Sequence, residues 1–363
     1  MSGFFDKDFL QNIIDYILIL AVLVLVCFYI YKTIQENKKS SPTVKIIPYD
    51  DTPNSSQREE LNKIEGITTS SRITDAQFDP SNDNALRLYC IKSSSNSAYT
   101  GGYMNLNMIK YVLSKGCRFL DFEVYMKDNV PIVAYSTSKQ SLETFTSNAP
   151  AISFSGVCTT IISNAFSDTS PNPKDPLFIH LRIKTYDSTA YTQIAEIIKT
   201  TLGPKLYTQK DGMNNVAVPV NLDSQITSML GKIIIIVDET SSPGYKNYAT
   251  CAPKDVECYS LSNVVNMTSN SQSTRIYNEN ALTFQPINPP DPDVYLYRIV
   301  FPNIGYFNNT TNSSSTYLIK NYGVQVVAQA FFVNDTNLIN YEGIFKENKS
   351  AFVRMKSLLN DYE

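Results

Sequence analysis

Tryptophan is absent from this chain of 363 residues, and histidine occurs once. A mechanism that needs two imidazoles, or a metal site built from several histidines, cannot be formed by this chain alone. Charged residues are scarce at 18%, and 31 Lys and Arg against 34 Asp and Glu leave a formal net charge of -3. This balance argues against a nucleic-acid-binding protein, which normally carries a basic surplus or stripe.

The six cysteines form no CxxC pair and have no histidine partner, so we do not expect a zinc site. Cys251 and Cys258 are close enough in sequence to bridge, and whether they pair is left open. Apolar residues make up 43% of the chain, including 24 Tyr and 18 Phe, which is enough for a substantial core. The whole chain is therefore not disordered, and its length suits two average domains or one large barrel.

One long apolar run follows an N-terminal flank of residues 1–12. It extends from Ile13 to Tyr31 with Asp15 as its one charge. At about 1.5 Å per residue, a helix of this length nearly crosses a hydrocarbon core of roughly 30 Å. The run lacks the basic start and small-residue end of a signal peptide, so we predict a single transmembrane helix over residues 13–32. The Lys residues after it favour a cytoplasmic location for the large domain.

Residues 33–82 are polar and rich in Ser, Thr, Asn and Pro, which predicts a tether. The rest of the chain, residues 83–363, alternates strand-like apolar runs with segments of helical period. The expected strands are 86–92, 118–125, 131–135, 177–184, 232–237, 257–261, 295–301 and 324–332. Eight strands separated by helices predict an α/β fold, a (β/α)8 TIM-type barrel. A doubly wound open sheet is the alternative, but its usual Gly-rich turn is missing.

Four segments carry most of the polar side chains expected at the carboxyl ends of these strands. They are SSSNSAYTGG (Ser93–Gly102), GCRFLDFEVY (Gly116–Tyr125), PIVAYSTS (Pro131–Ser138) and PLFIHLRIK (Pro176–Lys184). In this order they resemble the phosphatidylinositol-specific phospholipase C family with its X and Y domains. RIVFP (Arg298–Pro302) and YGVQVVAQAFF (Tyr322–Phe332) look like later strands of the same family.

The resemblance implies a phosphodiesterase with two catalytic histidines and, in the eukaryotic type, a calcium ion held by carboxylates and an Asn. The first histidine position falls on Asn96 and the second at or near Thr137, and neither side chain takes a proton near pH 7. A family carboxylate on the fourth strand falls on Arg182. The expected basic phosphate-binding position falls near Ile236, in an apolar run.

Two acids remain on the second strand: Asp121 stands where the family has Glu, and Glu123 stands where it has Asp. We therefore expect these family positions to be degenerate, with no catalytic residue, no cofactor and no metal. Our hypothesis is that Arg182 bridges to Asp121 or Glu123 and replaces the ion, because a guanidinium supplies a permanent positive charge. The alternative is a residual metal site at Asp121 and Glu123. For the single histidine, His180, a hydrogen-bonded core role is favoured over that of a relocated general base.

The leading functional hypothesis is a membrane-anchored pseudo-phospholipase with a structural or binding role. Its expected partners are a bilayer through residues 13–32 and neighbouring structural or capsid proteins, with no nucleic acid. The Asn- and Tyr-rich composition suits a minor capsid-associated protein in the virion membrane of a large DNA virus. The alternative is a divergent phosphodiesterase that cleaves phosphoinositide or other lipid headgroups with His180, Asp121 and Glu123. A third possibility is an anionic headgroup held by Lys184, Lys139 and nearby serines without turnover.

Overall fold

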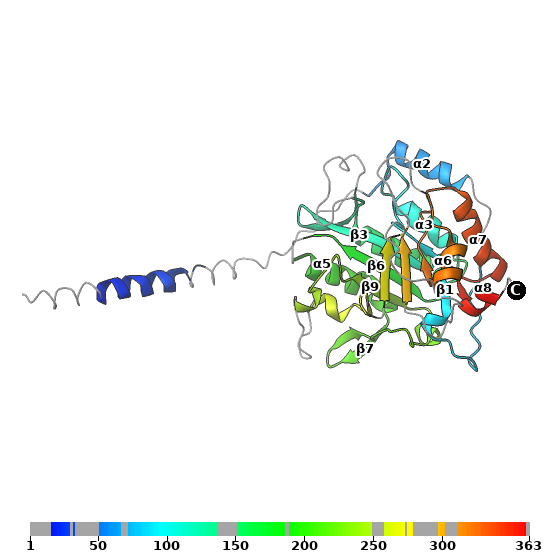
Figure 1. Ribbon diagram of the computed structural model, residues 1–363. Helices are drawn as coiled ribbons and strands as arrows, with labels where there is room; N and C mark the ends of the chain where they lie inside the picture. The colour runs from blue at the N-terminus through cyan, green and yellow to red at the C-terminus, as the bar shows by residue number, and fades with distance from the viewer. Residues whose placement is uncertain are drawn as a thin grey trace, which may run out of the picture. The chain divides into compact units, whose positions relative to one another are not determined.

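The chain divides into two units, Met1–Pro48 and Tyr49–Glu363, in the computed structural model (Figure 1). The structure describes residues 16–29, 32, 51–66, 72–136, 151–185, 189–248, 258–272, 274–278, 297–301 and 311–360.

The first unit contains a helix over residues 16–29, and the side chains of these residues are exposed. In the part of the chain that the structure describes, no helix combines enough length and apolar character to span a membrane. The predicted transmembrane helix over residues 13–32 is therefore wrong, although residues 13–15, 30 and 31 lie outside the described residues.

The second unit is built on a sheet of seven strands. Its order is β10 (Met267–Ser269), β9 (Ile233–Asp238), β6 (Leu177–Ile183), β3 (Phe119–Lys127), β4 (Val130–Val133) and β5 (Ile152–Ser153), with β2 (Ser93–Ser94) also paired to β3. The strands β2, β3, β6, β9 and β10 run parallel to one another. The expected strands at 118–125, 177–184 and 232–237 are confirmed. Their apolar residues are buried, which is typical of parallel strands covered by helices.

A second, parallel sheet contains β11 (Thr274–Asn278), β12 (Tyr297–Phe301) and β13 (Val326–Val327). The predicted TIM barrel does not close. Within the described ranges no ladder joins β10 to β11, and the segment after β13 meets β2 in a single isolated bridge, Ser94 to Gln329. The reason at the first gap is local: Asn270 has a φ of 58° and the Ser271 N–H donates to Thr274 O at 2.9 Å. This turn ends β10, which pairs with β9. The next strand, β11, pairs with β12.

The expected barrel strand at 131–135 is also corrected, because β4 runs antiparallel to β3. Asp128 and Asn129 connect the two strands and have φ values of 51° and 60°. Two central residues with positive φ form the tight turn of a hairpin, which permits only antiparallel pairing. The expected strand at 257–261 fails as well, because residues 258–260 are irregular and a 3-10 helix begins at Leu261.

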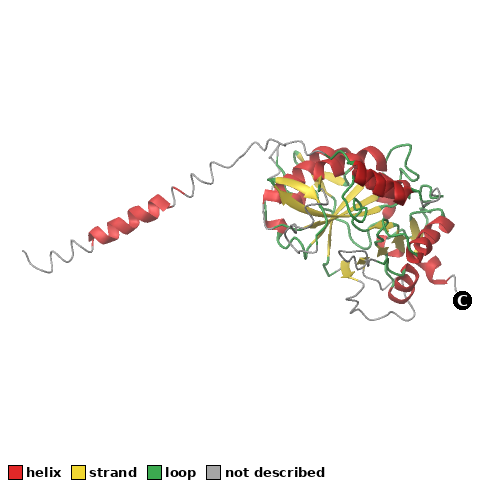
Figure 2. Cartoon of the chain, turned by 90° about the horizontal axis from the view of Figure 1, so that it is seen from above, coloured by secondary structure: helices red, strands yellow, loops and turns green. Residues whose placement is uncertain are grey.

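Helices pack outside the strands (Figure 2). They are α3 (Leu106–Ser114), α4 (Phe154–Ala165), α5 (Thr189–Ile197), α6 (Ser315–Tyr322), α7 (Thr336–Asn348) and α8 (Met355–Asn360). Two short antiparallel pairs complete the unit. They are β1 (Tyr89–Ile91) with β14 (Phe352–Arg354), and β7 (Thr208–Asp211) with β8 (Asn214–Ala217). Cys258 is disulfide-bonded, whereas Cys251 lies outside the described residues.

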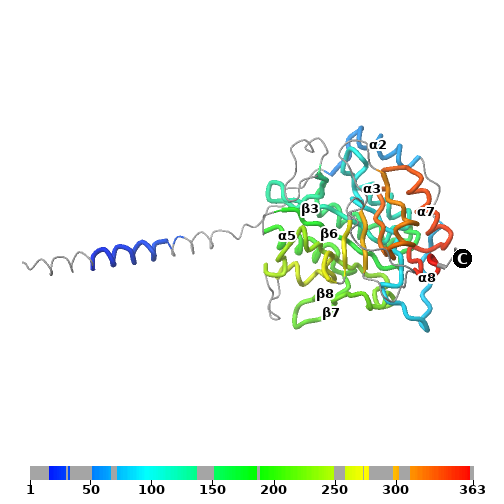
Figure 3. The backbone as a smooth tube through the Cα atoms, in the orientation of Figure 1, coloured from blue at the N-terminus to red at the C-terminus, as the bar shows by residue number. Residues whose placement is uncertain are grey.

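The compact unit begins well before residue 83, so it includes part of the predicted tether. Asp51 accepts hydrogen bonds from the Ser153 N–H at 2.8 Å and the Ser153 hydroxyl at 2.5 Å, at the start of α4. Residues Ser55–Glu65 form α2, which lies beside α3 (Figure 3). The Leu61 side chain of α2 is buried. Asn54 and Gln57 form a capping box, which satisfies two N–H groups at the start of α2.

Candidate functional site

Asp121, Glu123, His180 and Arg182 lie on one side of two neighbouring strands. In the parallel ladder between β3 and β6, Asp121 is paired with His180 and Glu123 with Arg182. Because alternate residues of a strand point to the same side, all four side chains meet between the two strands. The C-terminal ends of parallel strands are also where α/β folds place their ligands.

The Arg182 guanidinium lies at the centre of this cluster. Its Nε is 3.0 Å from Asp121 Oδ1, its Nη2 is 2.5 Å from Asp121 Oδ2, and its Nη1 is 2.6 Å from Glu123 Oε1. Nη2 also donates to Asn96 Oδ1 at 2.9 Å. The Arg182 side chain is 16% exposed, whereas both acids are buried. The predicted ion pairs between Arg182 and the acids of the second strand are thus confirmed.

Glu123 has further partners besides Arg182. The Lys184 ammonium lies 3.0 Å from Glu123 Oε1, while the Tyr125 hydroxyl and the Ser136 N–H donate to Oε2 at 2.7 Å and 3.3 Å. Two cations therefore face two carboxylates in the cluster, and their formal charges cancel. Lys184 is engaged here and is not available as a free cation for an anionic headgroup.

His180 is a buried residue with both ring nitrogens in hydrogen bonds. Nδ1 lies 2.8 Å from Asp121 Oδ1, and Nε2 lies 2.7 Å from the Ser269 hydroxyl. The ring stacks on Phe119 and packs against Phe301, with centroids 5.7 Å apart in both pairs. The prediction of a hydrogen-bonded core histidine is confirmed.

The pKa shifts follow from this mixture of burial and pairing. Burial alone would raise the pKa of Asp121, but the Arg182 charge and the hydrogen bond to His180 outweigh it, so the pKa lies below its usual value. Burial lowers the pKa of Lys184 and Glu123 offsets part of this effect. Burial, together with the neighbouring Glu123 carboxylate, raises the pKa of the Tyr125 hydroxyl.

Asn96 stands at the first catalytic histidine position of the resemblance. Its backbone has a φ of 42°, in the left-handed region, where Asn is among the better tolerated residues. The Asn96 N–H donates to Asp121 Oδ2 at 3.1 Å, which helps to hold this conformation. Ile236 is buried on β9, while Thr137 and Lys139 lie outside the described residues.

The donor set does not fit a calcium ion. Calcium takes six to eight oxygen ligands, but a guanidinium lies between the carboxylates of Asp121 and Glu123 and hydrogen-bonds to both. Among the residues that the structure describes, no group of three or more His, Cys, Asp or Glu side chains is arranged to hold a metal.

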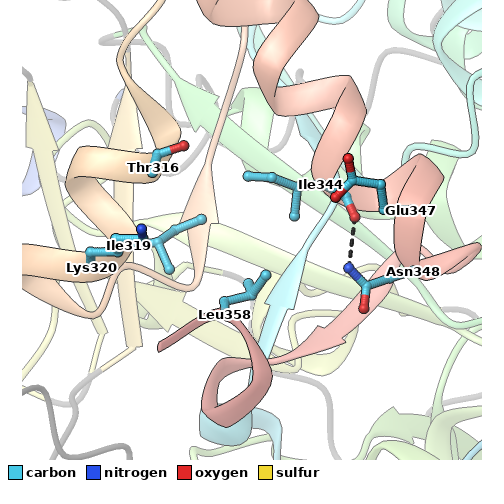
Figure 4. A pocket seen from close by; sticks show the side chains of 7 residues that line it. All are labelled: Thr316, Ile319, Lys320, Ile344, Glu347, Asn348 and Leu358. Carbon is cyan, nitrogen blue, oxygen red and sulfur yellow. Dashed lines mark hydrogen bonds between the residues drawn. The ribbon is translucent and has the colours of Figure 1, made fainter. Parts of the chain in front are cut away.

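A separate pocket of about 300 Å³ lies between α6, α7 and α8 (Figure 4). Ile319, Ile344 and Leu358 are its apolar lining residues, and Asn348 Nδ2 donates to Ile344 O at 2.8 Å. Lys320 and Glu347 supply its two charges.

Sequence reasoning missed Ser269, Tyr125 and Ser136 as members of the cluster. Tyr125 could have been found, because it is two residues beyond Glu123 on the same side of β3. Ser269 was missed because no strand was expected at β10. Ser136 takes part through its backbone N–H, for which the side chain gives no signal.

Comparison with known proteins places this geometry in context. A family model described as phosphatidylinositol-specific phospholipase C, X domain, matches residues 82–238. Similar solved structures include PLC21 of L. pealei, with 19% identity and a TM-score of 0.55 over 76% of this chain. PLC21 of S. officinalis has 18% identity and a TM-score of 0.54 over 78% of this chain. The chain spans 38% of the length of each of these proteins. No curated protein matches it.

Proposed function

Residues 82–238 belong to the phosphatidylinositol-specific phospholipase C family, and from this premise we propose that the chain is a catalytically silent member with a binding or structural role. The fold of a family and the chemistry of its site are separable, because packing layers persist when site residues change. The proposal concerns the site and not the fold.

The observation that carries the proposal is the Arg182 guanidinium between Asp121 and Glu123. It supplies positive charge where the family resemblance calls for an ion. A guanidinium with fixed hydrogen bonds cannot offer open coordination positions to a phosphodiester, as a metal ion does.

Proton transfer is the second requirement that the site does not meet. Cleavage of a phosphodiester needs a group that takes a proton from the attacking hydroxyl and a group that assists the leaving oxygen. The Asn96 amide can do neither near pH 7. His180 is fully buried, and its two ring nitrogens are already hydrogen-bonded to Asp121 and Ser269.

The test is the release of water-soluble inositol phosphate from phosphatidylinositol vesicles, with and without calcium. We expect no release above the background without protein. Wild-type turnover that is lost in Asp121→Asn would overturn the proposal. Turnover that is unchanged in this variant identifies a contaminating enzyme and leaves the purified chain inactive, as proposed.

A divergent phosphodiesterase is the second candidate, and one observation favours it. Ser269, His180 and Asp121 are hydrogen-bonded in series, the arrangement in which a histidine accepts a proton from a hydroxyl and a carboxylate orients the ring. It ranks second because all three side chains are fully buried and Asp121 is also neutralised by Arg182. In the vesicle assay, this candidate predicts turnover that is reduced by Ser269→Ala.

A further inference from the structure

The loop after Asn96 binds a carboxylate from α2. Glu60 Oε1 accepts a hydrogen bond from the Gly102 N–H at 2.8 Å, and Glu60 Oε2 lies 3.1 Å from the Thr100 hydroxyl. The Thr100 N–H donates to Tyr103 O at 2.9 Å, which closes the loop around these donors. The Thr100 hydroxyl also lies 3.0 Å from Tyr103 O, so its one hydrogen is shared between this carbonyl and Glu60. We call Thr100, Gly101 and Gly102 the oxyanion cradle.

The two glycines leave room for the close approach of the carboxylate. Gly101 has a φ of +111°, which side chains of L-residues rarely adopt. A Cβ at Gly102 would lie 3.2 Å and 3.3 Å from the two Glu60 oxygens. An N–H group exposed by a glycine turn, next to a hydroxyl, is a general way of binding oxyanions.

The oxyanion cradle lies beside the Arg182 cluster. The Tyr99 N–H donates to Asn96 O at 2.8 Å, and the Ser97 N–H donates to Asp121 O at 2.9 Å. The Tyr99 ring packs against Tyr135, with centroids 5.0 Å apart, and Tyr135 directly precedes Ser136. The same short loop therefore joins the cradle to the side chains that bind Arg182.

Glu60 is held in the cradle by the attachment of α2. Gln57 Nε2 donates to Met104 O at 3.4 Å, and Asn105 Nδ2 donates to Gln57 O at 3.3 Å. Burial raises the pKa of the Glu60 carboxyl, although Thr100, Gly102 and the charge of Lys63 act in the opposite direction. The carboxylate thus loses solvation in the cradle, while Lys63 adds positive charge nearby.

We propose that the oxyanion cradle is a binding site for a phosphate-type oxyanion, and that Glu60 occupies it as an internal competitor. A tetrahedral oxyanion can take the same Gly102 N–H and Thr100 hydroxyl once the carboxylate has left, with Lys63 contributing charge. The inference is independent of the proposed function, because the cradle lies outside the Arg182 cluster and needs no turnover.

The test compares three variants of the full chain by calorimetric titration with inorganic phosphate. Glu60→Ala should bind phosphate about tenfold more tightly than the wild type, because one competing charged hydrogen-bond acceptor is removed. Glu59→Ala is the matched control, since Glu59 is exposed on the same helix and pairs with Lys63. The double variant Glu60→Ala/Gly102→Ala should lose the gain, because its Cβ fills the cradle.

Circular dichroism and thermal melting establish that α2 stays folded in each variant. If Glu60→Ala detaches the helix, Glu60→Gln gives the same test with a side chain of nearly equal shape and no charge. The proposal is overturned if neither variant binds phosphate more tightly than Glu59→Ala.

Phosphate groups also occur on lipids, so a second arm separates the sources. Glu60→Ala is sedimented with phosphatidylcholine vesicles that contain or lack phosphatidic acid. Sedimentation that requires phosphatidic acid, and is lost in the double variant, supports a phospholipid headgroup in the cradle. No sedimentation together with a gain in phosphate binding supports a free anion. Sedimentation that persists in the double variant, with no gain in phosphate binding, overturns the proposal.

Discussion

Arg182 binds Asp121 through two hydrogen bonds, with Nε 3.0 Å from Oδ1 and Nη2 2.5 Å from Oδ2. Two nitrogens of the guanidinium thus donate to the two oxygens of the carboxylate, which gives the pair geometric specificity in addition to charge. The same guanidinium also binds Glu123. Its removal would leave two buried carboxylates without the positive charge that compensates for their desolvation.

We expect Arg182→Met to lower the free energy of unfolding by about 3–5 kcal/mol, as for other buried pairs that lose one partner. Urea denaturation measures this loss. Lys63→Ala removes an exposed pair and should leave the midpoint nearly unchanged. A loss below about 1 kcal/mol in Arg182→Met would contradict the central role of the guanidinium.

Calcium should not bind the wild-type cluster with micromolar affinity, because Arg182 holds the carboxylates that the ion would need. Arg182→Glu places an acid where the guanidinium was and should create measurable calcium binding. Calorimetric titration of both proteins with calcium chloride is the measurement. Micromolar binding by the wild type would show that the guanidinium does not exclude the ion.

Asp175 should make the stability depend on pH between about 4 and 6. Burial raises the pKa of its carboxyl to about 6 in the folded chain, against about 4 when unfolded. The folded state then binds more protons in this window, so the stabilising contribution, full below pH 4, is lost as the pH rises through 6. A difference of about two between the folded and unfolded pKa values corresponds to a change of at most about 3 kcal/mol in the unfolding free energy.

The measurement for Asp175 is the unfolding free energy of the wild type and of Asp175→Asn across this pH range. The difference between the two proteins should change with pH, with the wild type losing stability relative to the variant as the pH rises. The lowered pKa of Asp121 makes the unfolding free energy fall as the pH drops below 4. This effect is the same in both proteins and therefore cancels in the difference between them. A difference that is constant from pH 4 to 6 would refute the assignment.

Ser269→Ala should cost about 1–3 kcal/mol of stability, because it leaves the buried Nε2 of His180 without its partner. Thermal or urea denaturation measures the change. Ser155→Ala, at a half-buried position in the first turn of α4, serves as a comparison, because the Ser155 hydroxyl makes a long hydrogen bond of 3.3 Å to the Ser153 hydroxyl. Equal stability of the two variants would mean that the hydrogen bond to His180 contributes little.

Much of the cluster could be predicted because it depends on the spacing of residues along each strand. Asp121 and Glu123 are two residues apart, as are His180 and Arg182, so each pair must share one side of its strand. Once the two strands are neighbours, charge alone favours Arg182 between the acids. The turn at Asp128 and Asn129 also carried a readable hairpin signal.

Barrel closure could not be predicted in this way. It depends on whether β10 continues its pairing or turns at Asn270, and no local pattern in the sequence decides between these outcomes. The apolar run near the N-terminus has the composition of a membrane span, but composition alone does not establish that a helix spans a membrane. Ser269 depends on the same unpredicted strand.

The contact between Asp51 and Ser153 has a practical consequence for the limits of the folded unit. A fragment that started at residue 83, where the polar segment was expected to end, would remove the carboxylate that holds the first turn of α4 and would uncover the face on which α2 rests. Recombinant versions of the second unit should therefore start upstream of Asp51, and shorter ones should be more susceptible to proteolysis at that end.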